Sequence, residues 1–210
     1  MKLFQTYIKK YSLGFTLVEF IVIMAIFAVM VGVVLFNFTG FRSRVTLDNL
    51  AQDIALSIRN IQTSAGASIS TDRPESEIPR GIYFPYSSEL GTYDTKFILF
   101  QDNDGSGLYD AGEEIDTIVL QTPDRITDIV YGSDLTTLMT PIGNESLGIT
   151  FRRFTTSATF RDSSLNESVT NAGVIRIRIS SPDRQLSRFI TISKIGQVSV
   201  QNDDTVPQNS

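Results

Sequence analysis

Four acidic side chains recur in the short segment DNDGSGLYDAGE, residues 102–113. In the twelve-residue calcium loop, oxygen ligands stand at positions one, three, five, seven, nine and twelve, and glycine stands at the sixth. The matching residues here are Asp102, Asp104, Ser106, Asp110 and Glu113, with Leu108 offering its backbone carbonyl at the seventh position. Calcium binds six to eight oxygens, and the glycine lets the chain turn back around the ion. The segment therefore predicts a candidate calcium site.

The surroundings of this segment leave a second interpretation open. Its flanking sequences have the alternation of β-strands, so the segment would be a calcium-type loop in a hairpin and not an EF-hand. The dipeptides Asp-Gly and Ser-Gly are also common in ordinary hairpin turns. A solvated turn without a metal ion is the alternative to the calcium loop.

A further carboxylate, Glu19, is the only charge between Phe15 and Phe36. These 22 residues would span about 33 Å as a helix, which matches a hydrocarbon core about 30 Å thick. A carboxylate in such a span costs up to ~3 kcal/mol at the bilayer centre and less near an end. A nearby cation lowers that cost. In an assembly of parallel helices, a neighbour's newly exposed amino terminus is the nearest candidate cation.

The composition excludes most catalytic chemistry. The chain contains no Cys, His or Trp, so Ser-His and Cys-His nucleophiles, disulfides and the usual zinc sites cannot be built. An enzyme would have to use carboxylates alone, for example as a glycosidase, and nothing in the sequence singles out a converging pair. We therefore expect a protein that is not an enzyme, with calcium as its one candidate cofactor.

The N-terminal residues carry a family resemblance. KKYSLG at residues 9–14 is followed by FTLVE at residues 15–19 and then by the long apolar run. This arrangement resembles the N-terminus of type IV prepilins and type II secretion pseudopilins. The resemblance implies that a prepilin peptidase cuts between Gly14 and Phe15 and methylates the new amino group of Phe15. It also implies that Glu19 pairs with the Phe15 amine of an adjacent subunit in a helical filament.

The function implied is a structural subunit of a type IV pilus or a type II secretion pseudopilus. The alternative is a minor pilin whose β domain binds DNA or a surface. Arg176 and Arg178 lie on one face of an expected strand, but the chain from Phe15 onward has 15 basic and 23 acidic side chains. We interpret this face as solvated, and nucleic acid is not an expected partner.

The charge distribution also predicts the membrane topology. Lys2, Lys9 and Lys10 all precede the apolar run, and lysines beside a span favour a cytoplasmic position for that end. No small-residue cleavage site of the secretory kind follows the run. We expect a single-pass inner-membrane protein with an extracytoplasmic C-terminal domain, which joins a periplasmic or extracellular filament after assembly.

The spacing of apolar residues along the chain predicts the helices and strands that carry these candidate residues. A leader (1–14), a transmembrane helix (15–37) and an amphipathic continuation (38–66) precede a β-rich domain (67–200) and a disordered tail (201–210). Apolar residues in the continuation recur at three and four positions: Leu47, Leu50, Ile54, Ile58 and Ile61. The stripe predicts a helix that packs on its own sheet. The fold class is therefore α+β, with a long N-terminal helix on a mainly antiparallel sheet domain.

From Gly81 the hydrophobic period falls to two. Nine expected strands are separated by Gly, Pro, Asp, Asn or Ser. They are GIYF, TKFILF, IDTIVLQT, ITDIVY, LGITF, SATF, GVIRIRIS, RFITIS and QVSV.

Overall fold

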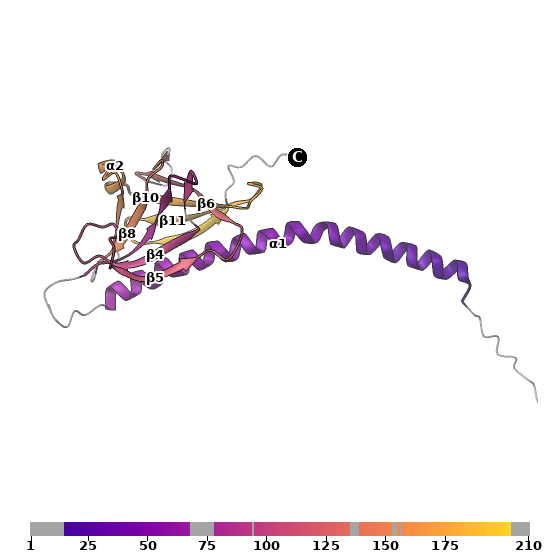
Figure 1. Ribbon diagram of the computed structural model, residues 1–210. Helices are drawn as coiled ribbons and strands as arrows, with labels where there is room; N and C mark the ends of the chain where they lie inside the picture. The colour runs from indigo at the N-terminus through magenta and orange to yellow at the C-terminus, as the bar shows by residue number, and fades with distance from the viewer. Residues whose placement is uncertain are drawn as a thin grey trace, which may run out of the picture. The chain divides into compact units, whose positions relative to one another are not determined.

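The computed structural model describes residues 15–67, 78–93, 95–134, 139–152, 155 and 157–202, without the side chains of residues 36–41 and 67 (Figure 1). The expected leader and most of the expected tail lie outside the described residues. The chain divides into two compact units, one that ends at Arg42 and one that begins at Ser43. Each unit is described separately below.

The first element is the α-helix α1 (Leu17–Ala67), which continues through Gly32 and Gly40. Its segment Leu17–Leu35 has a mean hydropathy of 2.9, and none of it is buried within the protein. Among the described residues this is the one helix long and apolar enough to cross a membrane. At ~1.5 Å per residue, its 19 residues span about 28 Å. The segment therefore suggests a membrane anchor.

The second unit contains two antiparallel five-stranded sheets. The first sheet has the order β5 (Glu114–Val119), β4 (Lys96–Gln101), β1 (Arg80–Phe84), β8 (Leu147–Phe151) and β9 (Ala158–Asp162). The second has the order β12 (Val198–Asn202), β11 (Ser187–Ser193), β10 (Val174–Ser180), β6 (Arg125–Gly132) and β7 (Thr140–Pro141). A short pair, β2 (Tyr86–Ser87) and β3 (Thr92–Tyr93), and the helix α2 (Glu167–Thr170) complete the described elements.

One hydrophobic core joins the C-terminal half of α1 to both sheets. The helix contributes the stripe Leu47, Leu50, Ala51, Ile54, Ala55, Ile58, Ile61 and Ala65. The first sheet adds inward residues such as Phe84 and Phe97, whose ring centroids lie 5.9 Å apart, and the second adds isoleucines of β6, β10 and β11. The expectation that the amphipathic stripe packs on the chain's own sheet is confirmed.

Polar contacts fix the same half of α1 along the second sheet. The Arg59 guanidinium donates from Nη2 to the Val198 carbonyl at 2.9 Å, and the Gln62 amide donates to the Gly196 carbonyl at 3.1 Å. Further back along the helix, Asp48 forms an ion pair with Arg188 of β11. These contacts set the helix position along the strands, which apolar packing alone leaves free to slide.

The first sheet is also covered on the face that points away from the core. All five residues of β8 are buried, although alternate residues of a strand point to opposite faces. A Cβ added to Gly148 would lie 2.2 Å from the Gly107 carbonyl oxygen, so the loop between β4 and β5 lies directly on β8. On the same outer face, Phe100 is fully buried and lies over Gly81, where an added Cβ would be 2.6 Å from its ring.

The nine expected strands are all present, and the α+β fold class is confirmed. Three two-residue strands, β2, β3 and β7, were not predicted because two residues show no period. The single turn α2 was also missed; the Asn166 side chain caps it by accepting from the Ser168 N–H at 2.9 Å. β12 continues to Asn202, two residues into the expected tail.

The contact between Gly148 and the loop gives a first prediction. We expect Gly148→Ala to lower the free energy of unfolding by about 1–3 kcal/mol, because a methyl group there has to displace loop backbone. Gly66→Ala is the matched control: Gly66 lies near the end of α1, and no atom of the described residues lies within 4 Å of an added Cβ. Thermal unfolding of the full chain in detergent measures both. Equal stability of the two variants would mean that the loop does not lie on β8.

Candidate functional site

The loop that carries the candidate calcium ligands, residues 102–113, joins β4 to β5. Backbone hydrogen bonds fix both of its ends: Gln101 N–H donates to the Glu113 carbonyl, and Asp102 N–H donates to the Pro79 carbonyl, each at 2.9 Å. Gly105 and Gly107 both have φ +78°, a conformation that glycine adopts without steric cost. The loop thus turns back on itself at the glycine that the calcium-loop pattern places sixth.

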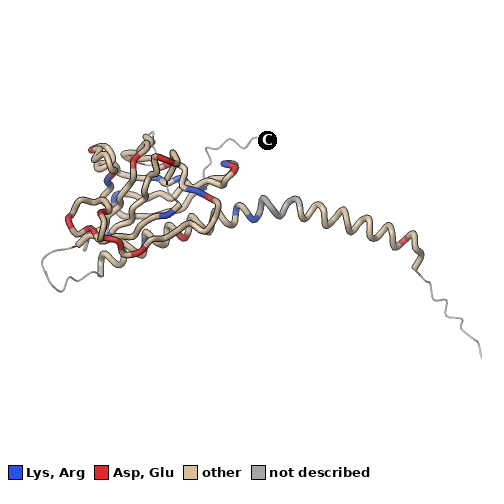
Figure 2. Tube along the Cα trace, viewed as in Figure 1, with Lys and Arg blue, Asp and Glu red and all other residues tan. Residues whose placement is uncertain are grey.

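Three of the expected ligands come together. Among the described residues, Asp102, Asp104 and Glu113 form a group whose candidate ligand oxygens all lie within 4.8 Å of one another, and the carboxylate of Asp110 is not part of it. The remaining two expected ligands are adjacent, because the Ser106 hydroxyl lies 3.2 Å from the Leu108 carbonyl oxygen. In Figure 2, acidic positions follow one another along this loop, at the left of the β domain.

Backbone N–H groups hold the three carboxylates in place. Glu113 accepts from Asn103 N–H at 2.7 Å and from Asp110 N–H at 3.1 Å, one on each oxygen. Asp104 accepts from the Ser106 N–H at 2.8 Å. Asp102 is only 3% exposed, and its Oδ2 accepts from Gly107 N–H at 3.1 Å. Its buried Oδ1 has no hydrogen-bond partner among the described residues.

The pKa values of two carboxyls in the group are shifted in opposite directions. Burial raises the pKa of the Asp102 carboxyl, the Gly107 hydrogen bond opposes the rise, and the nearby Glu113 charge adds to it. The pKa of Asp104, at the surface, is lowered by its hydrogen bonds from Ser106. No Lys or Arg within the described part of the chain forms an ion pair with any of the three carboxylates. Within the described residues, the group therefore concentrates negative charge without an ion-pair partner.

An aromatic contact holds the middle of the loop on the sheet. The Tyr109 ring packs edge-on against Phe100 of β4, with centroids 6.1 Å apart, and also contacts Tyr83 of β1 at 5.7 Å. The Arg161 side chain of β9 lies beside Gly107, within 3.5 Å of where a Cβ would stand. The acidic loop is thus a packed cover over the outer face of the first sheet.

The start of α1 is the second candidate site. The Thr16 hydroxyl accepts from the Glu19 N–H at 3.2 Å, and the Thr16 carbonyl accepts from the Phe20 N–H at the same distance. Thr16 is therefore the N-cap, and Thr-Leu-Val-Glu has the spacing of a capping box. Sequence reasoning assigned no role to Thr16, although a Thr three residues before a Glu is the signal that finds such a cap. Glu19 lies in the first turn, where the helix dipole favours a negative charge.

The helix that follows presents apolar side chains in every direction. Leu17 is 75% exposed, and large apolar residues remain exposed from Phe15 to Leu35. Such a surface has to be covered by lipid or by other helices. Gly14, the residue before the expected cleavage, lies outside the described residues.

Residues 9–35 match the prokaryotic N-terminal methylation motif. The chain fits the type IV prepilin and pseudopilin family. The decisive combination is this motif with the apolar helix that begins at Leu17. No curated protein and no solved structure matches the chain. In this family the motif belongs to structural subunits, which a peptidase processes and which assemble with other pilin subunits.

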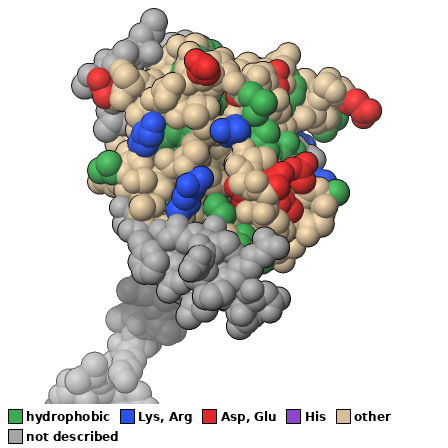
Figure 3. Space-filling model, turned by 90° about the vertical axis from the view of Figure 1, so that its left-hand side faces the viewer, with side chains coloured by type: hydrophobic (Ala, Val, Ile, Leu, Met, Phe, Trp, Pro, Cys, Tyr) green, Lys and Arg blue, Asp and Glu red, His purple; other side chains and the backbone are tan. Residues whose placement is uncertain are grey.

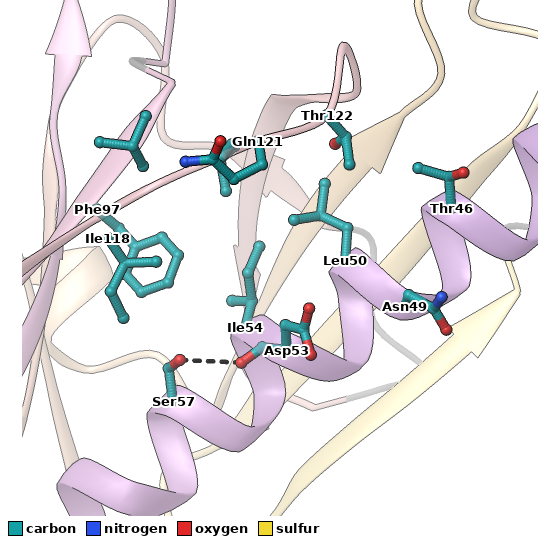
Figure 4. A pocket seen from close by; sticks show the side chains of 12 residues that line it. Thr46, Asn49, Leu50, Asp53, Ile54, Ser57, Phe97, Ile118, Gln121 and Thr122 are labelled. Carbon is teal, nitrogen blue, oxygen red and sulfur yellow. Dashed lines mark hydrogen bonds between the residues drawn. The ribbon is translucent and has the colours of Figure 1, made fainter.

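The β domain also has a groove of about 330 Å³ between α1 and the β4–β5 pair (Figure 4). Leu50 and Ile54 of the helix face Phe97 and Ile118 of the strands across it. Asp53 is the one titratable residue in its lining. The groove therefore does not contain the pair of carboxylates that a glycosidase would need.

The arginines of β10 are engaged in a packing contact. The guanidinium groups of Arg176 and Arg178 lie 5.7 and 4.8 Å from the centre of the Phe189 ring, within the range of cation–π contacts. On the face of the β domain shown in Figure 3, the basic side chains are separated from one another, and acidic side chains lie toward the edges of that face. Whether nucleic acid binds this chain stays a prediction.

The aromatic contact of the loop gives a second prediction. Tyr109→Ala should lower the free energy of unfolding by about 1–3 kcal/mol, because it removes two aromatic pairs, each of which contributes about 0.5–1.5 kcal/mol. Tyr109→Phe keeps both ring contacts and should leave stability nearly unchanged. Denaturant unfolding of the full chain in detergent distinguishes the two. A Phe variant as unstable as the Ala variant would show that the ring contacts are not what holds the loop.

Proposed function

We propose that this chain is a structural subunit of a type IV pilus or a type II secretion pseudopilus. It is made as a precursor, cut by a prepilin peptidase between Gly14 and Phe15, and methylated on the new amino group of Phe15. The observation that carries the proposal is the match of residues 9–35 to the methylation motif at the start of an exposed apolar helix. Such a helix can be stored in a membrane and later transferred to the core of a filament.

The topology follows from the charges around the span. The lysines of the leader keep that end in the cytoplasm, where the peptidase cuts, and the acidic β domain lies outside. Before assembly the subunit is a single-pass inner-membrane protein. After assembly its β domain lies on a periplasmic or extracellular filament.

Glu19 supplies the assembly contact. After cleavage, the Phe15 amine lies close to the helix start, and an incoming subunit can place it against the Glu19 carboxylate of a neighbour. Both charges are costly at membrane depth when they are alone, and each compensates the other when they meet. The pairing therefore favours a helix inside the assembly over a helix alone in lipid.

Processing gives a prediction at Gly14. Gly14→Val should leave an uncleaved precursor in the membrane, because a β-branched side chain next to the scissile bond obstructs the peptidase. Immunoblots of membrane and sheared-filament fractions, with wild type beside the variant, measure the ratio of precursor to mature chain. A Val variant cut as completely as wild type would contradict this role of Gly14.

Assembly gives a prediction at Glu19. Glu19→Gln keeps the side chain that a capping box accepts but removes the negative charge. If the charge pairs with a neighbour's amine, Gln should reduce incorporation into filaments at least tenfold, while membrane insertion and cleavage remain normal. Glu19→Val should behave in the same way.

The matched control is Glu89→Gln, which removes an equal charge from an exposed turn of the β domain. This variant should assemble normally. Normal incorporation of Glu19→Gln together with loss in Glu19→Val would assign Glu19 to helix capping and would contradict the pairing role.

A further inference from the structure

We propose that the acidic loop, residues 102–113, binds one calcium ion through the carboxylates of Asp102, Asp104 and Glu113. The Ser106–Leu108 segment of the same loop offers two further oxygens, a hydroxyl and a carbonyl 3.2 Å apart. The Asp110 carboxylate stands outside the group and can contribute only through a bridging water, as ninth-position residues of calcium loops often do. The bound ion would fix the loop as the cover of the first sheet's outer face.

The first argument is the buried, unpaired oxygen of Asp102. A carboxylate that is 3% exposed and keeps one oxygen without a donor is unfavourable unless a cation neutralises it. This side chain points into a group with two more carboxylates, and within the described chain none of the three has an ion-pair partner. A divalent cation would offset the negative charge of the three carboxylates and would also give Asp102 Oδ1 a partner.

The coordination that the loop can offer favours calcium over magnesium. The candidate ligand oxygens lie within 4.8 Å of one another, a spacing that either ion could accept. Calcium takes six to eight oxygens in irregular geometry, whereas magnesium requires a nearly regular octahedron and usually keeps several waters. Ligands drawn from one short irregular loop therefore fit calcium better.

The second argument is that the loop backbone is already arranged around the group. Amide hydrogens of Asn103, Gly107 and Asp110 donate to Glu113 and Asp102, so the loop backbone itself positions these two carboxylates. The two glycines with φ +78° allow this closed path. A site whose ligands are positioned in advance loses little conformational entropy on binding.

Binding would be coupled to the stability of the β domain through two loop contacts. Gly107 lies on Gly148 of β8, and Tyr109 lies on Phe100 of β4. A ligand that binds the folded loop and not the unfolded chain stabilises the fold in proportion to the logarithm of its concentration above Kd. The inference is independent of the filament role, because its test measures ion binding and not assembly.

The test uses the full chain in detergent and calcium chloride as the probe. We expect isothermal titration calorimetry to show one site with Kd about 10⁻⁴–10⁻³ M, the range of extracellular calcium modules. Calcium at about a hundred times Kd should raise Tm by roughly 5–10 °C relative to chelator. Magnesium should bind at least tenfold more weakly.

Two variants and one control make the test specific to the loop. Asp102→Asn removes the buried ligand charge and should abolish the calcium-dependent shift. Asp104→Asn removes a ligand at the surface, where folding is not at risk, and should weaken binding at least tenfold. Asp116→Asn removes the same charge from the exposed face of β5 and should bind like wild type.

Three results would overturn the proposal. The first is the absence of calcium heat together with an unchanged Tm for the wild type. The second is a loss of binding in Asp116→Asn as large as in Asp104→Asn, which would indicate screening of general negative charge. The third is an equal response to magnesium and calcium that survives Asp104→Asn. Any of them would leave the loop as a packed cover of the sheet without a calcium site.

Discussion

The apolar surface of α1 between Leu17 and Leu35 is the constraint on which the rest of the account depends. Nothing within this segment is buried by the chain itself, yet the helix is long enough to cross a bilayer. Lipid can cover such a surface, and so can a bundle of identical helices. A helix that is stable in both environments can move from one to the other, which is what a subunit drawn from a membrane into a filament has to do.

The same helix changes character after Arg42, because its later residues pack into the core of the β domain. There an apolar stripe forms one core with two antiparallel sheets, and Arg59 and Gln62 fix its position along the strands. The acidic loop covers the outer face of the first sheet and buries Phe100 and Gly148. Charge repulsion within the loop opposes this packing, and a cation would remove that opposition.

The periodic spacing of apolar residues allowed most helices and strands to be predicted from the sequence. The change of period after Gly81 indicated all nine longer strands, and the stripe from Leu47 to Ile61 indicated the packed half of α1. Strand order and the division into two sheets could not be predicted, because they depend on contacts between distant residues. The spacing of acidic residues in the loop predicted Asp102, Asp104 and Glu113 as candidate ligands, and the structure brings these three together. The carboxylate of Asp110 lies outside the group because of the path that the loop backbone takes, which the spacing does not reveal. The Thr16 cap could have been predicted from sequence, because a Thr three residues before a Glu is the pattern of a capping box.

The most direct test of the central claim is the N-terminal mass of the mature protein. Mass spectrometry of wild-type chain purified from sheared filaments should find an N-terminal peptide that begins at Phe15 and carries one methyl group on its amine. A mature chain that begins anywhere after Phe36 would have lost the apolar helix. That result would contradict the account of this chain as a prepilin-type subunit.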